Sequence, residues 1–142
     1  MVDRPKIEVE AVTLDSLIEH IGRARLIFID VEGAEPKVLA GARQYLETFT
    51  PFIILEAKPK WLRRSHSSLQ KLHSELVSLG YKVFDSKSKR FHAPDLETSR
   101  GTDWLCIHSA SSFELDHTID YMRKVLSIPF ASGLNPLTRF RN

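Results

Sequence analysis

Two short runs of apolar residues, each ending at a carboxylate, organise the first half of the chain. The first predicts a strand over 26–30 whose last residue is Asp30, and the second, over 52–55, ends at Glu56. Short unbroken apolar runs are typical of strands that are buried on both faces, as in a parallel sheet. Between them, residues 35–49 carry apolar side chains at helical spacing. This strand, helix and strand predict a βαβ unit of an α/β fold.

The flanking segments predict further elements of the same domain. Alternation over 7–12 predicts a half-exposed strand, and the helical spacing that follows predicts a helix capped by Thr13 and closed by Gly22. The second half is expected to hold a helix from Ser67 or Ser68 to Leu79, strands over 81–85 and 103–108, and an amphipathic helix over 113–127. The two strands, separated by a long polar loop, suggest an antiparallel hairpin at a sheet edge.

Composition narrows the class of protein. The 142 residues fit one domain, and the net charge of +2 comes from scattered basic residues, so nucleic acid is not an expected partner. Cys106 is the only cysteine, which excludes an intramolecular disulfide and fits a reducing compartment. No apolar run approaches the length of a membrane span, and residues 1–5 do not resemble a signal peptide. We therefore expect a cytoplasmic protein that does not bind membranes.

The candidate chemistry is concentrated where the two apolar runs end. Ligands of α/β sheets bind beyond the carboxyl ends of the strands, which is where Asp30, Glu32 and Glu56 are expected. For Asp30 we favour a functional role, whereas Glu35 is expected to stabilise the positive end of the following helix. Glu56 either lines the same crevice or is an ordinary carboxylate at a strand end. Three such acids could bind a divalent cation, but strand-end acids also arise for electrostatic reasons, and no metal is predicted. Trp61 is either a stacking lid for a substrate or a side chain that packs over the sheet end.

Several motifs in register resemble the FkbM family of S-adenosylmethionine-dependent methyltransferases. They are Val-Thr-Leu-Asp-Ser-Leu-Ile (12–18), Ile-Asp-Val-Glu-Gly-Ala-Glu (29–35), Val-Leu-Ala-Gly-Ala (38–42) and Pro-Phe-Ile-Ile-Leu-Glu (51–56). Their order and spacing match the family throughout residues 9–57. The later strands fit the same fold but carry no specific motif.

The resemblance implies a Rossmann-like methyltransferase sheet that is partial: the fourth to seventh strands with flanking helices and an antiparallel closing hairpin. Residues 1–110 would form this partial methyltransferase domain, and 111–142 a C-terminal helix and irregular tail. The implied reaction is transfer of a methyl group from S-adenosylmethionine to a hydroxyl of a sugar, polyketide or similar small molecule. Asp30 would orient the acceptor or act as general base. Glu32 is the second candidate and could instead contact the cationic side of the cofactor. Gly33 would let the backbone pass close to a ligand or turn into the helix, and Glu35 and Glu56 would lie nearby.

The glycine-rich turn that binds the cofactor in the family has no counterpart in this sequence. The six glycines stand at 22, 33, 41, 80, 101 and 133, and none of them forms a Gly-x-Gly turn. One alternative is therefore a catalytically inactive truncated remnant, or a binding or assembly module that needs a partner chain. Without the first strand of the complete sheet, strand 26–30 would be an unpaired edge. We accordingly expect a homodimer or a complementing N-terminal half.

Overall fold

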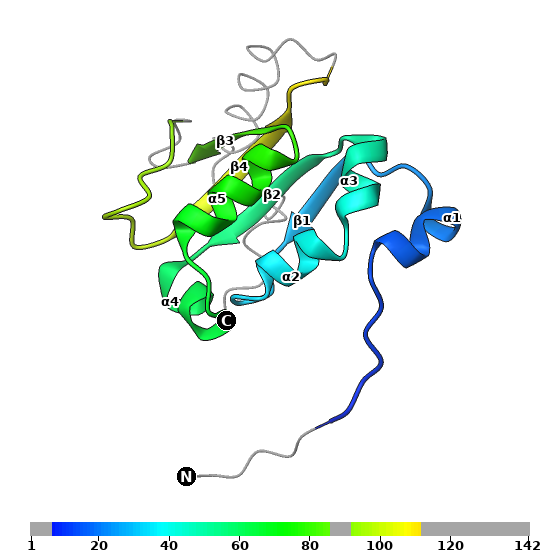
Figure 1. Ribbon diagram of the computed structural model, residues 1–142, viewed down its shortest axis with the longest axis horizontal. Helices are drawn as coiled ribbons and strands as arrows, with labels where there is room; N and C mark the ends of the chain where they lie inside the picture. Colours follow the sequence, from blue (N-terminus) through cyan, green and yellow to red (C-terminus); the bar gives the residue numbers. More distant parts are fainter. Residues whose placement is uncertain (1–6, 86–91, 112–142) are drawn as a thin grey trace, which may run out of the picture.

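A four-stranded mixed sheet forms the centre of the computed structural model, which describes residues 7–85 and 92–111 (Figure 1). The strands are β1 (Leu26–Ile29), β2 (Phe52–Ala57), β3 (Tyr81–Asp85) and β4 (Thr102–His108). Their order in the sheet is β1-β2-β4-β3. β1 and β2 are parallel, whereas β4 lies antiparallel to both of its neighbours. The parallel pair agrees with the predicted βαβ unit, and β1 and β3 form the two edges of the described sheet.

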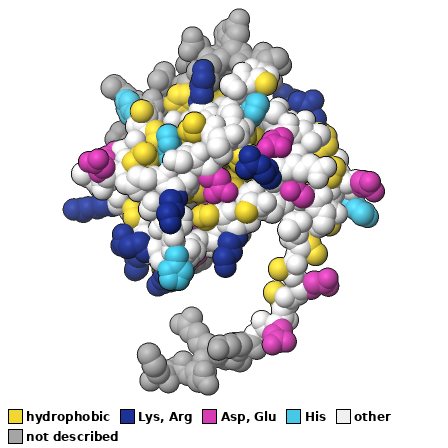
Figure 2. All heavy atoms as spheres, viewed as in Figure 1, with side chains coloured by type: hydrophobic (Ala, Val, Ile, Leu, Met, Phe, Trp, Pro, Cys, Tyr) yellow, Lys and Arg dark blue, Asp and Glu magenta, His cyan; other side chains and the backbone are white. Residues whose placement is uncertain are grey.

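The main helices cover one face of this sheet. Figure 1 shows α2, α3 and α5 side by side on that face. The helical elements are η1 (Asp15–Leu17), α1 (Ile18–Ile21), α2 (Glu35–Ala40), α3 (Arg43–Phe49), α4 (Pro59–Leu62), η2 (Arg63–Ser65) and α5 (Leu69–Ser78). Basic and acidic side chains are interspersed over the surface on this side (Figure 2). No helix in the described part of the chain is long and apolar enough to cross a membrane.

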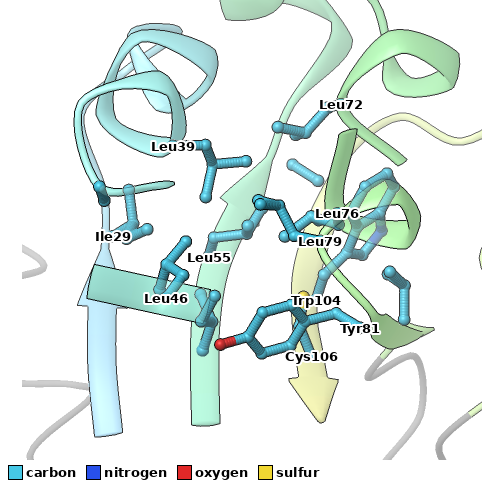
Figure 3. Packing of buried hydrophobic residues seen from close by; sticks show 14 of the residues in the cluster. Ile29, Leu39, Leu46, Leu55, Leu72, Leu76, Leu79, Tyr81, Trp104 and Cys106 are labelled. Atoms are coloured by element: carbon cyan, nitrogen blue, oxygen red, sulfur yellow. The ribbon is translucent and has the colours of Figure 1, made fainter. Parts of the chain in front are cut away.

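The core lies between the helices and the sheet. Alternate residues of β2, Ile53 and Leu55, are fully buried, as the two-residue period of a strand requires. Figure 3 shows leucines of α2, α3 and α5 meeting side chains of the strands. Trp104 of β4 and Tyr81 of β3 fill the space beneath α5 (Figure 3). Cys106 is buried in the same cluster, as its apolar neighbours in the sequence suggest.

The prediction that β1 is buried on both faces is wrong. Ile29 is buried, but Leu26 and Phe28 are 50% and 52% exposed. β1 pairs only with β2 among the described strands, and its two faces differ because α2 and α3 cover only one of them. An apolar run identifies a strand but does not reveal that it lies at an edge.

The single helix predicted over 35–49 is two helices, α2 and α3, separated at Gly41 and Ala42. The break is held by Asp15, which is distant in the sequence. Its carboxylate oxygens accept the N–H groups of Gln44 at 3.1 Å and Tyr45 at 2.8 Å, which lie in the first turn of α3. These bonds satisfy amides that would have no partner at a helix start, so Asp15 caps α3 from another element.

The strand predicted over 7–12 is also wrong. This segment is extended, but no described strand pairs with it, and Ile7 and Val9 are 84% and 80% exposed. Nearby local predictions are confirmed: the Thr13 hydroxyl accepts the N–H of Ser16, and Gly22 ends α1 with a positive φ. The predicted helix over 113–127 and the tail 129–142 lie outside the described residues.

Candidate active site

The loop over 30–34 carries the acids singled out in the sequence and connects β1 to α2 (Figure 1). Asp30 and Glu32 are both exposed. Glu32 has a φ of 49° and Gly33 a φ of 104°, so the chain turns through two residues in the left-handed region. A residue other than glycine is uncommon there, and such strain is concentrated at functional sites. Thr50 and His66 share this conformation at the ends of α3 and η2, and in Glu32 it belongs to the tight turn that leads into α2.

Gly33 lies where two backbone segments approach each other. A Cβ atom at this position would meet the carbonyl oxygen of Trp61 and would lie 2.7 Å from its carbonyl carbon. The Ser65 hydroxyl donates a hydrogen bond to the Gly33 carbonyl, and Glu35 accepts the Gly33 N–H at 3.1 Å. Gly33 is thus fixed by α4, η2 and α2 together, and its backbone is close to Trp61.

Glu35 is the first residue of α2, as expected, but its side chain does not face solvent. It is 1% exposed, and its Oε1 atom makes the bond to Gly33. The Oε2 atom is buried and has no hydrogen-bond partner in the described part of the structure. Glu35 therefore lies behind the loop and holds its shape, and it is not presented to a substrate from the surface.

Glu56 lies beside Asp30 because β1 and β2 are parallel and in register. Ile29 pairs with Leu55, so the two acids follow at the same end of adjacent strands. Glu56 is half-buried and forms an ion pair with Lys58. The structure thus brings together two of the acids predicted from the strand ends, with a lysine beside them.

Lys58 is the main residue at this end of the strands that the sequence analysis did not single out. Its hydrogen bond to Glu56 raises the pKa of its ammonium group, while burial lowers it and the charges of Glu56, Asp30 and Asp103 raise it further. Asp103 belongs here because β4 pairs antiparallel with β2 and places it opposite Glu56. The spacing of Glu56 and Lys58, two residues apart in an extended chain, puts both side chains on one side and could have indicated the pair.

Trp61 is half-buried, and two cations lie over its ring. The Lys60 ammonium is 5.0 Å from the ring centroid and the Arg64 guanidinium is 4.0 Å from it. Both are within the range of a cation–π interaction. The backbone of Trp61 meets Gly33 while its ring carries these basic side chains, so the residue helps to fix the loop.

The exposed carboxylates at this edge suit contacts with hydroxyls and cations. Over residues 7–85 and 92–111, no group of three or more His, Cys, Asp and Glu side chains is placed to hold a metal ion. Chemically, the arrangement offers an accessible carboxylate at Asp30, a second at Glu32 on a strained turn, and a lysine that is held in its charged form by its neighbours.

The family model of the Methyltransferase FkbM domain matches residues 2–83, which include the loop over 30–34 together with Glu56 and Lys58. No curated protein and no solved structure gives a significant match. The matched segment is more than half of the chain and contains both parallel strands, and the chain therefore belongs to the FkbM methyltransferase domain family.

Proposed function

We propose that this chain carries the acceptor side of an S-adenosylmethionine-dependent O-methyltransferase, and that the acceptor is a hydroxyl of a sugar, polyketide or similar small molecule. The observation that supports this best is the accessible Asp30 at the end of β1, beside the Glu56–Lys58 pair, inside the segment that matches the family. The four described strands would correspond to the fourth to seventh strands of the family's sheet.

Methyl transfer to a hydroxyl requires that the acceptor oxygen be held in line and lose a proton. In the proposed mechanism the Asp30 carboxylate accepts a hydrogen bond from the acceptor hydroxyl, orients it and takes the proton. Glu32 is the second group: its exposed carboxylate, on a turn with a positive φ, would favour a cationic donor bound nearby. Lys58 keeps Glu56 in place through their ion pair.

The cofactor fits these residues only in part. S-adenosylmethionine supplies the electrophilic methyl group, and exposed carboxylates suit its cationic sulfonium. A Gly-x-Gly turn to bind it is not found in this sequence. We therefore propose that a complementing N-terminal half supplies the principal cofactor contacts. The single buried cysteine is in keeping with a reducing compartment such as the cytoplasm.

Calorimetric titration of the chain with S-adenosylmethionine tests how much of the cofactor site it holds. On this proposal the chain alone binds the cofactor weakly or not at all, and binding tightens when an N-terminal half from an FkbM-domain protein is added. Micromolar binding of S-adenosylmethionine by the chain alone would contradict the proposal that an N-terminal half supplies the principal cofactor contacts. Absence of binding in both samples would favour the alternative, a catalytically inactive remnant or assembly module.

Turnover by the complemented protein tests the role of Asp30. Transfer of a radiolabelled methyl group to a panel of sugars and polyketide alcohols would be measured for the parent and for Asp30→Asn. Loss of the proton acceptor is expected to lower kcat by roughly 10²–10⁴-fold. Glu47→Gln is the matched control, since that side chain lies on α3 and is 53% exposed. Equal kcat values for Asp30→Asn and Glu47→Gln would show that Asp30 takes no part in the mechanism.

A further inference from the structure

Residues 7–10, which we name the arm, have the alternating pattern of a strand but pair with no described strand. Apolar and acidic residues alternate from Ile7 to Glu10, and Ile7, Val9 and Val12 are 84%, 80% and 62% exposed. The arm leads away from the folded body (Figure 1), and Figure 2 shows its hydrophobic and acidic side chains in the open. Such apolar exposure is unfavourable in water, so the arm is suited to an apolar partner surface.

An apolar groove of matching character lies along β1. It has a volume of about 490 Å³ and is lined by residues of the segments 11–17, 27–31 and 34–41. Its lining is almost wholly apolar and includes Ile27 and Val38, and Lys37 is its one charged residue. No strand of the described sheet pairs with the outer edge of β1 beside this groove. An unpaired edge offers backbone N–H and C=O groups to any extended segment that reaches it.

The arm and the groove are complementary. As a strand, the arm would place Ile7 and Val9 on one side and Glu8 and Glu10 on the other. The apolar side matches the groove lining, and the acidic side would face away from the groove toward solvent. Addition of an extended segment to a sheet edge is a common mode of recognition, with backbone bonds for affinity and pockets for alternate side chains.

The arm does not occupy the groove of its own chain. Residues 11–14 already form one wall of the groove, whereas 7–10 lead away from it (Figure 1). To enter its own groove the chain would have to reverse direction near Glu10 and Ala11. The sequence there lacks the glycine, proline, asparagine or aspartate that tight turns favour. A second copy can present the same arm without any reversal.

We propose that two copies of this chain exchange arms: residues 7–10 of each copy add as a strand to the outer edge of β1 of the other and insert Ile7 and Val9 into its groove. The contact is reciprocal, so the assembly closes as a two-fold symmetric dimer. It buries the exposed side chains of both arms and completes both sheets by one strand. This inference concerns the chain in the absence of a complementing N-terminal half: a strand from that half and the arm of a second copy would compete for the same outer edge of β1.

Light scattering after size-exclusion chromatography, over a range of protein concentrations, measures the dimer. We expect a concentration-dependent dimer, because an interface made by two short arms is small. Val9→Asp places a charge in the groove and should raise the dimer dissociation constant by about tenfold or more. Val77→Asp is the control, since Val77 is 51% exposed on α5, away from the arm. A monomer at all concentrations, or equal effects of the two variants, would overturn the proposal.

Cysteine cross-linking distinguishes exchange from other modes of dimerisation. Val9→Cys and Val38→Cys would be prepared as separate variants and mixed under mild oxidation. Arm exchange predicts a disulfide-linked heterodimer in this mixture and none when Val9→Cys is mixed with Val77→Cys. The native Cys106 is buried, which raises the pKa of its thiol and keeps it out of the reaction. If the Val9→Cys, Val38→Cys double variant instead forms its disulfide within one chain, the arm folds onto its own groove and the proposal is wrong.

Discussion

The carboxylate of Glu35 accepts a hydrogen bond from the backbone N–H of Gly33 at 3.1 Å, although Glu35 itself is only 1% exposed. One residue at the start of α2 therefore fixes the turn that carries Asp30 and Glu32. The second oxygen of Glu35 is buried without a partner in the described structure, and a buried unsatisfied oxygen costs free energy. We infer that Glu35 is retained, despite its buried Oε2 atom, because its Oε1 atom fixes the shape of the loop.

Removing this carboxylate should destabilise the protein. Glu35→Ala leaves the Gly33 N–H without its acceptor and opens a cavity, so we expect the free energy of unfolding to fall by about 2–4 kcal/mol. Glu35→Gln keeps an acceptor oxygen and should cost clearly less. Equilibrium urea unfolding measures both. Glu47→Ala is the control, because its ion pair with Arg43 is exposed and is worth less than about 1 kcal/mol. Equal losses for Glu35→Ala and Glu47→Ala would contradict the role of Glu35.

Gly33 and Gly22 allow the effect of close packing to be separated from that of backbone strain. Both have positive φ, but a Cβ at Gly33 would collide with the backbone of Trp61, whereas at Gly22 it would meet nothing within 4 Å. Gly22→Ala should therefore cost only the strain of its backbone conformation (φ 60°, ψ −155°), which is almost exclusive to glycine, about 1–3 kcal/mol. Gly33→Ala should cost at least about 1 kcal/mol more, because the backbone of α4 must also shift. Thermal unfolding of the two variants gives the comparison, and equal shifts in Tm would show that α4 moves freely.

Much of this fold could be predicted because its signals are local. The apolar runs of β1 and β2 and the cap of α5, where the Ser68 hydroxyl accepts the Lys71 N–H, depend on residues a few positions apart. The break between α2 and α3 could not be predicted in this way. It is held by Asp15, whose carboxylate bonds Tyr45, 30 residues further along the chain.

The candidate site also has residues whose proximity could be predicted from the sequence and residues whose proximity could not. The proximity of Asp30 and Glu56 follows from the rule that adjacent parallel strands end at one edge. Asp103 joins them only because β4 inserts between β2 and β3 and does not simply follow β3 at the edge. The position of β4 in the sheet is set by tertiary packing, since Trp104 of β4 fills the space beneath α5. A strand's own sequence does not specify its neighbours.

The ion pair of Lys58 and Glu56 should make stability depend on pH in the alkaline range. The hydrogen bond to Glu56 raises the pKa of Lys58 above its ordinary value of 10.5. Because the folded-state pKa is the higher one, the stabilisation is fully present below pH 10.5 and is lost as the pH rises through the folded-state pKa. The side chain of Lys58 is 41% exposed, so screening by water keeps the effect small.

A double-mutant cycle measures that pair directly. The free energy of unfolding would be determined for the parent, Lys58→Gln, Glu56→Gln and the double variant, near neutral pH and again at a pH above 10.5. We expect a favourable coupling energy of no more than about 1 kcal/mol in the first condition and a smaller one in the second. A coupling that is unchanged between the two conditions would mean that the lysine charge does not carry the interaction.

Two buried tyrosines should respond in opposite ways to loss of their hydroxyl groups. The Tyr45 hydroxyl accepts the N–H of Ala24 and donates to the carbonyl of Gly22, both at 2.7 Å, so it fixes the connection between α1 and β1. Tyr45→Phe leaves both backbone groups without that partner and should lower the free energy of unfolding by about 1–3 kcal/mol.

The Tyr81 hydroxyl is buried without a hydrogen-bond partner among the described residues, and burial raises its pKa. Tyr81→Phe removes a polar group that gains nothing in the folded state while it keeps the ring that packs against His108. Its removal should therefore leave the free energy of unfolding unchanged or raise it by up to about 1 kcal/mol. Urea unfolding of Tyr45→Phe and Tyr81→Phe side by side tests the contrast. A loss at Tyr81→Phe as large as that at Tyr45→Phe would mean that the Tyr81 hydroxyl has a partner in solution.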